Sequence, residues 1–133
     1  MERVEKFGQV IYLDTHVVGW LYGGELQKIS KLAWDEINRG APAISPIVIL
    51  ELQYLFEVGR AKAPASRVLE TLSRDMGLSV CGLPFGQVIE SALSEKWTRD
   101  PFDRLIVAHA SANDAPLITK DEKIRRHYKR AIW

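Results

Sequence analysis

The sequence predicts an α/β fold, with a mostly parallel central sheet of about four to five strands flanked by helices. Two observations predict this class. Short segments rich in β-branched and aromatic residues alternate with longer segments of helical periodicity, and capping or turn residues separate them. The length of 133 residues suits one packed core, so we expect a single domain over residues 1–133.

The first third of the chain should form a strand and two helices. Residues 9–13 are a short β-branched and aromatic run, and this predicts the first strand. Asp14 and Thr15 follow it, and both are favourable helix N-cap residues. A short apolar helix is therefore expected over residues 16–22. A second helix is expected over residues 25–38, where apolar residues recur at helical spacing.

The alternation continues to the end of the chain. Ser45 followed by Pro46 is typical of an N-cap with proline at the first helical position, and Asp100 with Pro101 repeats this pattern. Further strands are expected over residues 41–45, 78–81, 116–119 and 131–133, and further helices over residues 46–58, 64–77, 84–96 and 101–113.

Charge and cysteine content exclude several classes of protein. The net charge is +1, so any nucleic-acid contact must come from a local patch. Cys81 is the only cysteine, which excludes an internal disulfide framework and a cysteine-rich zinc site. Residues 1–7 lack the apolar core of a signal peptide, and the longest apolar run, residues 47–50, is too short to span a bilayer. We therefore expect a cytoplasmic protein with no membrane association.

Two aspartates lie where functional groups collect in open α/β sheets, beyond the carboxyl ends of strands. Asp14 directly follows the first expected strand, and Asp121 comes two residues after the strand expected over 116–119. Each could instead serve only as a helix cap. Neither residue alone therefore predicts a catalytic site.

Glu51 is the most informative acid of the sequence. The residues three and four positions away on its expected helix share its face, and all are apolar or aromatic: Ile47, Val48, Tyr54 and Leu55. Burying an unpaired charge is costly, so a carboxylate within an apolar stripe needs a partner or a metal ion. An ion pair with an arginine, or capping of a neighbouring helix, is the structural alternative.

Asp100 and Asp103 stand at the N-cap and third position of one expected helix. Acids at these positions are accounted for by amide capping and the helix dipole, although two so close together also make a cation site. The functional argument therefore depends on the whole set of acids. Two carboxylates about 4 Å apart repel by roughly 4 kcal/mol at an effective dielectric near 20, which favours a divalent cation between them.

All-oxygen ligands favour Mg²⁺ or Mn²⁺ over zinc. A metal ion held by carboxylates can polarise a phosphoryl oxygen, activate water and stabilise a leaving oxyanion. Hydrolysis of a phosphodiester bond needs all three effects. The residue pattern therefore points to metal-dependent phosphodiester hydrolysis.

Four segments of the chain together resemble the PIN-domain nucleases, most closely the VapC-type toxins of VapBC toxin–antitoxin systems. These segments are YLDTH around Asp14, SPIVILEL ending beyond Glu51, RDPFDRLIVAHA around Asp103, and LITKDEKI around Asp121, in the family's order and over nearly the whole chain. His16 departs from the family, which more often has a small polar residue there. The departure puts no metal ligand in doubt.

The resemblance implies a PIN-like α/β/α sandwich and a metal-dependent endoribonuclease that is the toxin of a toxin–antitoxin pair. It implies an Mg²⁺ or Mn²⁺ site formed by the catalytic acids Asp14, Glu51, Asp103 and Asp121, with support from Thr15, Asp100 and Thr119. The implied partners are RNA (often transfer or ribosomal RNA), a cognate antitoxin near residues 59–65, and a second copy of the chain.

Residues 120–130 form a strongly basic segment. A solvated basic face is the usual interpretation of such a run, but this one follows an expected site acid, so we expect contact with the RNA backbone. The expected contacts are Lys120, Lys123, Arg125, Arg126, Lys129 and Arg130. Trp97, just before the RDPFD segment, is the tryptophan expected to be able to face a substrate.

Two alternatives compete with the nuclease. A catalytically idle PIN-like binding module tends to lose acids, whereas this chain retains the set. A phosphate-accepting receiver-type signalling domain also places acids around Mg²⁺, and Lys120 could serve as its late lysine. The strand expected over 78–81 is followed by Gly82, however, so the acceptor aspartate is missing.

Overall fold

The computed structural model describes residues 9–133, and it contains one five-stranded sheet in the order β3-β2-β1-β4-β5. Every neighbouring pair of strands is parallel, where the sequence predicted a mostly parallel sheet. The strands are β1 Val10–Leu13, β2 Ala41–Ile44, β3 Ser79–Val80, β4 Leu117–Ile118 and β5 Ala131–Ile132. The interpretation of residues 1–7 as lacking a signal peptide lies outside the described residues.

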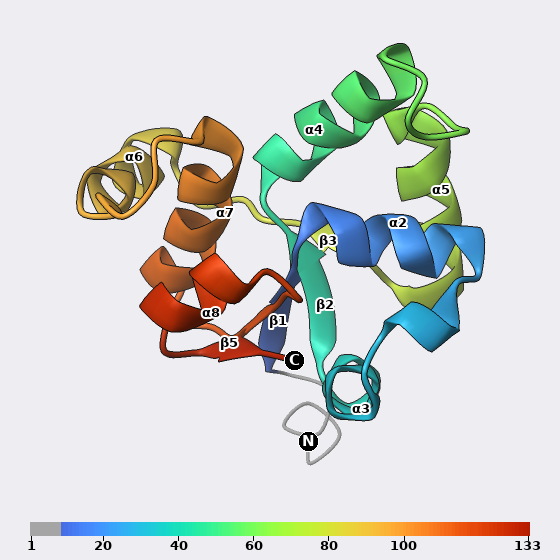
Figure 1. Ribbon diagram of the computed structural model, residues 1–133, viewed down its shortest axis with the longest axis horizontal. Coiled ribbons are helices and arrows are strands. Elements are labelled where there is room, and N and C mark those ends of the chain that lie inside the picture. The colour runs from blue at the N-terminus through green and yellow to red at the C-terminus, as the bar shows by residue number, and fades with distance from the viewer. Residues whose placement is uncertain (1–8) are drawn as a thin grey trace.

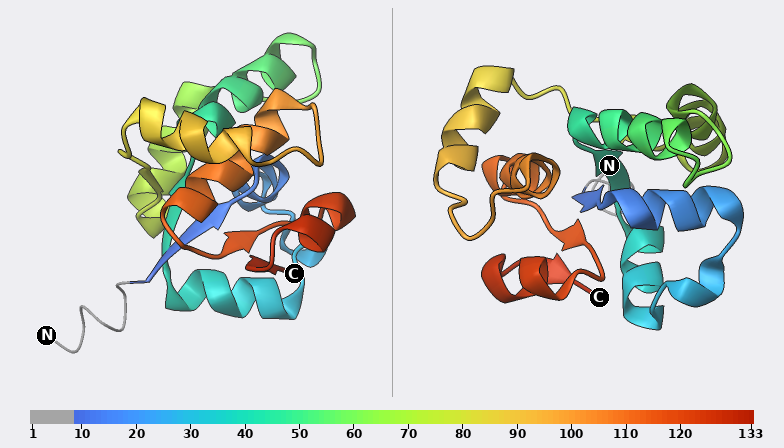
Figure 2. Two further views of the ribbon diagram at one scale, coloured as in Figure 1. Left: turned by 90° about the vertical axis from the view of Figure 1, so that its left-hand side faces the viewer. Right: turned by 45° about the horizontal axis from the view of Figure 1, so that its top comes forward.

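Helices cover both faces of the sheet. They are α2 Thr15–Gly23, α3 Lys31–Arg39, α4 Pro46–Glu57, α5 Ala65–Met76, α6 Phe85–Leu93, α7 Pro101–Ala112 and α8 Glu122–His127, with a short 3₁₀ turn η1 at Leu26–Lys28. Helices α6 and α7 lie on one side of the strands, and α2 and α3 lie on the other (Figures 1 and 2). The predicted α/β/α sandwich is confirmed. Within residues 9–133, each helix is too short or too polar to cross a bilayer.

Strand β1 forms the centre of the sheet. It pairs with β2 on one edge and β4 on the other, and Ile11, Tyr12 and Leu13 are at most 1% exposed. A strand covered on both faces reads as a continuous apolar run, which explains the VIYL sequence. Edge strand β3 differs, because both of its residues are exposed.

One predicted helix is wrong in its extent. The helix expected over residues 25–38 is split into η1 and α3, because Ile29 is extended, with φ −102° and ψ 128°. Ser30 then begins α3, and its hydroxyl accepts a hydrogen bond from the Ala33 amide at 3.1 Å. A serine inside an apolar-periodic segment favours a new N-cap over helix continuation.

The two Ser/Asp-Pro helix starts are confirmed. Ser45 caps α4 by accepting from the Ile47 amide at 3.2 Å, and Asp100 caps α7 by accepting from the Phe102 amide at 2.9 Å. Pro46 and Pro101 occupy the first helical turns, where a missing N–H costs nothing. These caps fix where the helices that carry Glu51 and Asp103 begin.

The strand order places a topological switch point between β1 and β4. The chain runs from β1 outward to β2 and β3, and then crosses to β4 on the opposite edge of β1. In open α/β sheets, ligands bind at the carboxyl ends of the strands that flank such a switch. Asp14 follows β1 at this place, and Thr119 follows β4.

Candidate active site

Asp14 is fixed through both of its carboxylate oxygens. It is 7% exposed, and its Oδ1 accepts a hydrogen bond from the Thr15 amide at 2.7 Å. Its Oδ2 accepts from the Thr119 hydroxyl at 2.6 Å. Burial raises the pKa of Asp14, and the hydrogen bonds from Thr119 and Thr15 oppose that rise. The carboxylate therefore has one orientation, held by two separate segments of the chain.

Thr119 links Asp14 to Asp121. The Thr119 side chain is fully buried, and its hydroxyl oxygen also accepts from the Asp121 amide at 3.1 Å. Asp121 caps α8, because its Oδ1 accepts from the Ile124 amide at 2.9 Å. Both the cap and the supporting hydroxyl therefore come from the segment directly after β4.

Glu51 reaches the same region from α4. The Thr15 hydroxyl donates to Oε1 of Glu51 at 2.6 Å. Burial raises the pKa of Glu51, the Thr15 hydrogen bond lowers it, and the negative charge of Asp14 raises it further. Among residues 9–133, no lysine, arginine or histidine forms an ion pair with Glu51. The expected structural alternative of an arginine partner is thus not found in this part of the chain.

Asp103 carries the clearest electrostatic signature of the site. Its pKa is raised to about 7, first by burial and then by the negative charges of Asp100, Asp14, Asp121 and Glu51. The charges of the four other carboxylates are therefore close enough to act on Asp103. The structure therefore brings together acids from four segments that are far apart in sequence.

These acids line one cavity of about 480 Å³. The lining comprises Asp14, Glu51, Asp100, Asp103 and Asp121, together with His16, Val17, Trp20 and Lys120. All four expected catalytic acids are present, and Asp100 joins them while it caps α7. Thr15 and Thr119 act behind this lining as hydrogen-bond donors to two of the acids.

The donor set fits a hard divalent cation. It consists of carboxylate oxygens, which Mg²⁺ and Mn²⁺ prefer, in a cavity with room for the waters that Mg²⁺ usually keeps. Within residues 9–133, no three His, Cys, Asp or Glu side chains approach closely enough to form a ready-made metal site. Mutual repulsion of unneutralised carboxylates favours such a spacing.

Sequence reasoning missed the part of the lining that comes from α2. His16 and Trp20 are four residues apart on this helix, so they share a face, and their rings lie 6.3 Å apart. Their spacing from Asp14 was the signal that could have found them. His16 also acts on the acids, because its charge lowers the pKa of Asp14 and of Glu51.

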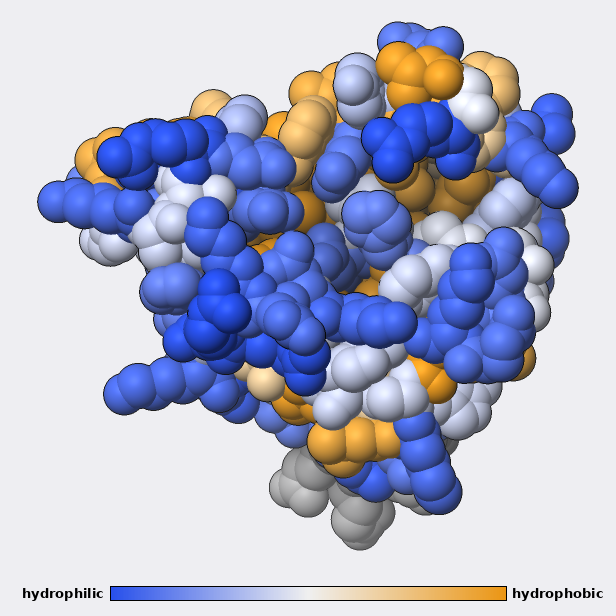
Figure 3. All heavy atoms as spheres, viewed as in Figure 1, coloured by the Kyte–Doolittle hydropathy of each residue, from blue (hydrophilic) through white to orange (hydrophobic). Residues whose placement is uncertain are grey.

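Of the six basic residues expected to contact RNA, only Lys120 lines the acidic cavity. The side chains of Lys123, Arg125, Arg126 and Lys129 are exposed on or just after α8, on a largely hydrophilic part of the surface (Figure 3). Arg130 is half-buried and donates to the Asp114 carbonyl and carboxylate.

Trp97 does not line the acidic cavity. Its ring stacks on His127, with centroids 5.0 Å apart and planes 4° apart. Trp97 therefore holds α8 against the segment that precedes α7, and its placement gives no support to the expectation that it faces a substrate.

Comparison with known proteins places the chain in a family. The PIN domain model matches residues 11–130. The chain is 32% identical over 123 residues to "Ribonuclease VapC22" of Mycobacterium tuberculosis, covering 88% of this chain and 91% of that relative. Its fold is similar to VapBC-1 from nontypeable Haemophilus influenzae, with a TM-score of 0.63, 19% identity, and 94% and 96% of the two chains covered. It is also similar to VapBC2 from Rickettsia felis, with a TM-score of 0.59, 20% identity, and 93% and 96% covered. This protein belongs to the PIN domain family.

Proposed function

We propose that this protein is a metal-dependent endoribonuclease with a single PIN domain, and that it is the toxin of a toxin–antitoxin pair. The observation that carries the proposal is the set of five carboxylates lining one cavity, where burial and then the charges of the other acids raise the pKa of Asp103 to about 7. Similarity to a relative named as a ribonuclease supports the choice of RNA. The receiver-type alternative has no support, because β3 is an edge strand without an acid.

The metal ion would be Mg²⁺ or Mn²⁺, held by Asp14, Glu51, Asp103 and Asp121. When bound, such an ion supplies Lewis acidity toward a phosphoryl oxygen and lowers the pKa of water. Thr15 and Thr119 orient Glu51 and Asp14, so that the acids do not have to reorganise when substrate binds. Lys120, at the wall of the same cavity, places a positive charge where it can bind a phosphate of the RNA.

We also propose a cognate antitoxin as a protein partner, because the similar solved structures are of toxin–antitoxin proteins. The segment 59–65 between α4 and α5 is the proposed contact. Apolar side chains at the end of α4 are unusually open there, with Tyr54 49% and Val58 48% exposed. A second copy of the chain and a cytoplasmic location complete the proposal. The cytoplasm suits Cys81, the sole cysteine of the sequence.

The proposed activity is tested by incubating purified protein with total cellular RNA in Mg²⁺, in Mn²⁺ or in EDTA. Asp103→Asn is the matched inactive variant, because the Asp103 side chain makes no hydrogen bond within residues 9–133 that the change would break. We expect discrete fragments that require metal and are absent with the variant. RNA left intact by the folded wild-type protein in both metals would contradict the proposal.

A further inference from the structure

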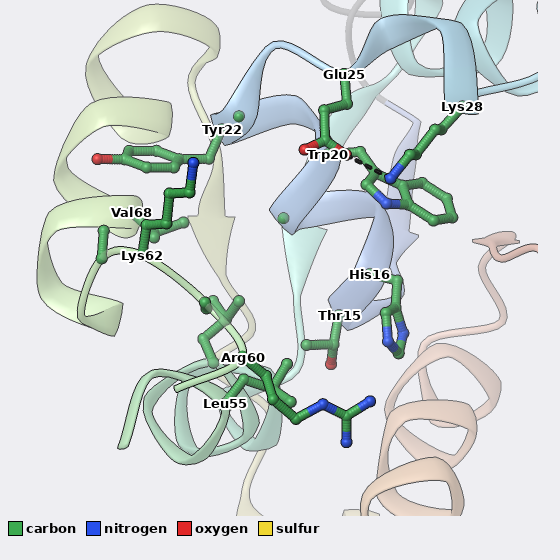
Figure 4. A pocket seen from close by; sticks show the side chains of 15 residues that line it. Thr15, His16, Trp20, Tyr22, Glu25, Lys28, Leu55, Arg60, Lys62 and Val68 are labelled. Carbon is green, nitrogen blue, oxygen red and sulfur yellow. Dashed lines mark ion pairs between the residues drawn. The ribbon is translucent and has the colours of Figure 1, made fainter. Parts of the chain in front are cut away.

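A second cavity adjoins the acidic one. It measures about 420 Å³ and lies between α2 and the segment joining α4 to α5 (Figure 4). His16 and Trp20 line both cavities, so these two side chains form a shared wall. A chain molecule with one unit in the acidic cavity can therefore continue past Trp20 into the second cavity.

The Trp20 indole has a cationic environment. The ammonium groups of Lys28 and Lys120 both lie 6.0 Å from the centroid of its ring. Lys28 also pairs with Glu25 at 2.8 Å, as Figure 4 shows, and this pair holds Lys28 beside the ring. An aromatic face flanked by ammonium groups suits a nucleobase and its phosphate, because the base stacks on the ring while the cations bind the phosphate.

Gly19 leaves space beside Trp20 in the second cavity. It lies in the interior of α2, where glycine costs roughly 0.5–1 kcal/mol relative to alanine. A Cβ atom at this position would meet no atom within 4 Å, so packing within the protein does not require glycine. The missing side chain instead widens the second cavity, which Gly19 lines.

Charge is distributed along the two cavities in the way that an RNA strand needs. The acidic cavity is lined by five carboxylates and would repel phosphates that lack a metal ion. The second cavity is lined by Lys28, Arg60 and Lys62, and among residues 9–133 Glu25 is the only acid in its lining, so it favours phosphates. In Figure 4, Arg60 and Lys62 extend from the segment after α4, opposite the side chains of α2.

We propose that Trp20 is a base-stacking platform, and that an unpaired base next to the scissile phosphate stacks on its indole. The neighbouring nucleotides then enter the second cavity and contact its basic residues. A paired base cannot present its face to a side chain, so the preferred substrate is single-stranded RNA such as a loop or an end. This inference rests on the proposed cleavage of RNA at the acidic cavity.

The test measures binding of a labelled twelve-residue oligoadenylate by fluorescence anisotropy. All variants carry Asp103→Asn, so that turnover does not interfere. Removing a stacking partner typically weakens single-strand binding by about 5- to 100-fold, and we expect Trp20→Ala to fall in that range while Trp20→Phe stays within about threefold of the parent. Trp34→Ala is the control, because it removes the same ring from α3, outside both cavities. We expect that control to bind like the parent.

Gly19→Leu provides an independent variant. It puts a side chain into the second cavity while favouring the helix, so it should weaken oligoadenylate binding about 5-fold or more without lowering the melting temperature. The same oligoadenylate paired with oligouridylate should bind parent and Trp20→Ala equally. Equal single-strand binding by the parent, Trp20→Ala and Gly19→Leu would overturn the inference and leave the second cavity to a protein partner.

These outcomes are separable from failure of the proposed nuclease. If wild-type protein cleaves RNA and Trp20→Ala has an unchanged KM, the stacking role is wrong and the nuclease stands. If wild-type protein leaves RNA intact but oligoadenylate binding still depends on Trp20, the nuclease proposal is wrong and the stacking role stands. A raised KM with little change in kcat for Trp20→Ala is the result that supports both.

Discussion

Thr15 and Thr119 show how single hydroxyl groups organise the acidic cavity. Thr15 donates to Glu51 at 2.6 Å, which joins the start of α2 to α4. Thr119 donates to Asp14 at 2.6 Å, which joins the end of β4 to the end of β1. Both hydroxyls are buried, so water does not compete for these bonds. The two threonines are therefore positioning residues for the acids.

Thr119→Val tests this role with nearly unchanged shape. The substitution removes the donor to the buried Asp14 Oδ2 and the acceptor for the Asp121 amide. Leaving a buried polar group unpaired costs about 1–3 kcal/mol, and we expect a loss of this size in the free energy of unfolding measured in urea. RNA cleavage should fall as well. Thr119→Ser is the matched control that should restore both, and a Thr119→Val protein as stable as wild type would contradict this role.

Asp103 gives a prediction whose sign depends on pH. Its pKa is raised from 3.8 to about 7 in the folded protein, so the folded state favours the protonated carboxyl. Ionised Asp103 therefore destabilises the folded protein. This destabilisation is absent below the pKa of the unfolded chain, grows as pH rises from about 4 to about 7, and reaches its full size above pH 7. Metal-free protein should therefore lose stability across that interval.

Asp103→Asn should remove this cost. We expect it to stabilise the metal-free protein at pH 8 by about 1–2 kcal/mol, after allowing for solvent screening at a partly exposed group, and to have little effect at pH 4.5. Denaturation in EDTA at the two pH values measures the difference. Glu90→Gln, at an exposed acid of α6 outside the cavity, is the control. A variant less stable than wild type at pH 8 would contradict the predicted repulsion.

Sequence reasoning at the residue scale found the acids but not their aromatic neighbours. Asp14 and Asp121 stood out because each follows a strand, and Glu51 because it breaks an apolar pattern, whereas Asp103 was singled out by the family resemblance. Trp20 fits the apolar pattern of α2, so nothing distinguished it from a core residue. Its place between two cavities depends on how α2 packs beside α4 and α5, which a local pattern does not specify.

At the scale of elements, capping residues decided which predictions held. Ser45 and Asp100 precede proline and gave correct helix starts, whereas Ser30 lies inside an apolar-periodic segment and was overlooked. Helix α8 was likewise hidden in the basic segment, although Asp121 caps it and Glu122 lies in its first turn. Periodicity over six residues is too short to indicate a helix, so the cap was the only available signal.

Ser45 does more than cap α4. Its hydroxyl lies 2.7 Å from Nδ1 of the buried His109 on α7, so it also joins the helix that carries Glu51 to the helix that carries Asp103. Burial lowers the pKa of His109, which keeps the ring neutral and able to share this bond. The bond thereby fixes the separation of two walls of the acidic cavity.

We therefore expect Ser45→Ala to cost more than an ordinary cap. Loss of a cap alone typically costs about 1 kcal/mol, and loss of the 2.7 Å bond to His109 adds about 1 kcal/mol, because Nδ1 then keeps only its longer contact with the Leu105 carbonyl at 3.3 Å. Ser30→Ala, which removes only the cap of α3, is the reference. Urea denaturation of both variants makes the comparison, and an equal or smaller loss for Ser45→Ala would show that the bond to His109 contributes nothing.

At the scale of the whole molecule, strand order explains why distant acids meet. The strand segments were predictable from short apolar runs, but the order β3-β2-β1-β4-β5 was not, because pairing depends on how the crossover helices pack. That order places the ends of β1 and β4 side by side, and Asp14 and Thr119 then come within 2.6 Å across 105 positions of sequence. The site is thus a property of the topology.

The net charge of +1 conceals a separation of charge, because acidic and basic side chains lie on different parts of the surface. Arg125 and Arg126 are exposed on α8, beside the acidic cavity that Asp121 lines. If they contact the RNA backbone, the double variant Arg125→Ala/Arg126→Ala should weaken RNA binding. Each lost phosphate contact reduces the slope of the log binding constant against log salt concentration by about 0.7, so the double variant should reduce it by about 1.4. The double variant Arg67→Ala/Arg74→Ala on α5 is the control, and an identical salt slope for both double variants would exclude α8 from the interface.

Titration of Mn²⁺ into the metal-free protein, followed by calorimetry, tests most directly the central claim that acids from four segments form one metal site. Asp14→Asn, Glu51→Gln, Asp103→Asn and Asp121→Asn each remove one proposed ligand, and Glu90→Gln removes an exposed acid of α6 outside the cavity. We predict saturable binding by wild type and the Glu90→Gln control, weakened at least about 10-fold by each of the four substitutions. Binding that survives the four substitutions unchanged, or that is absent from the folded wild-type protein, would contradict the claim.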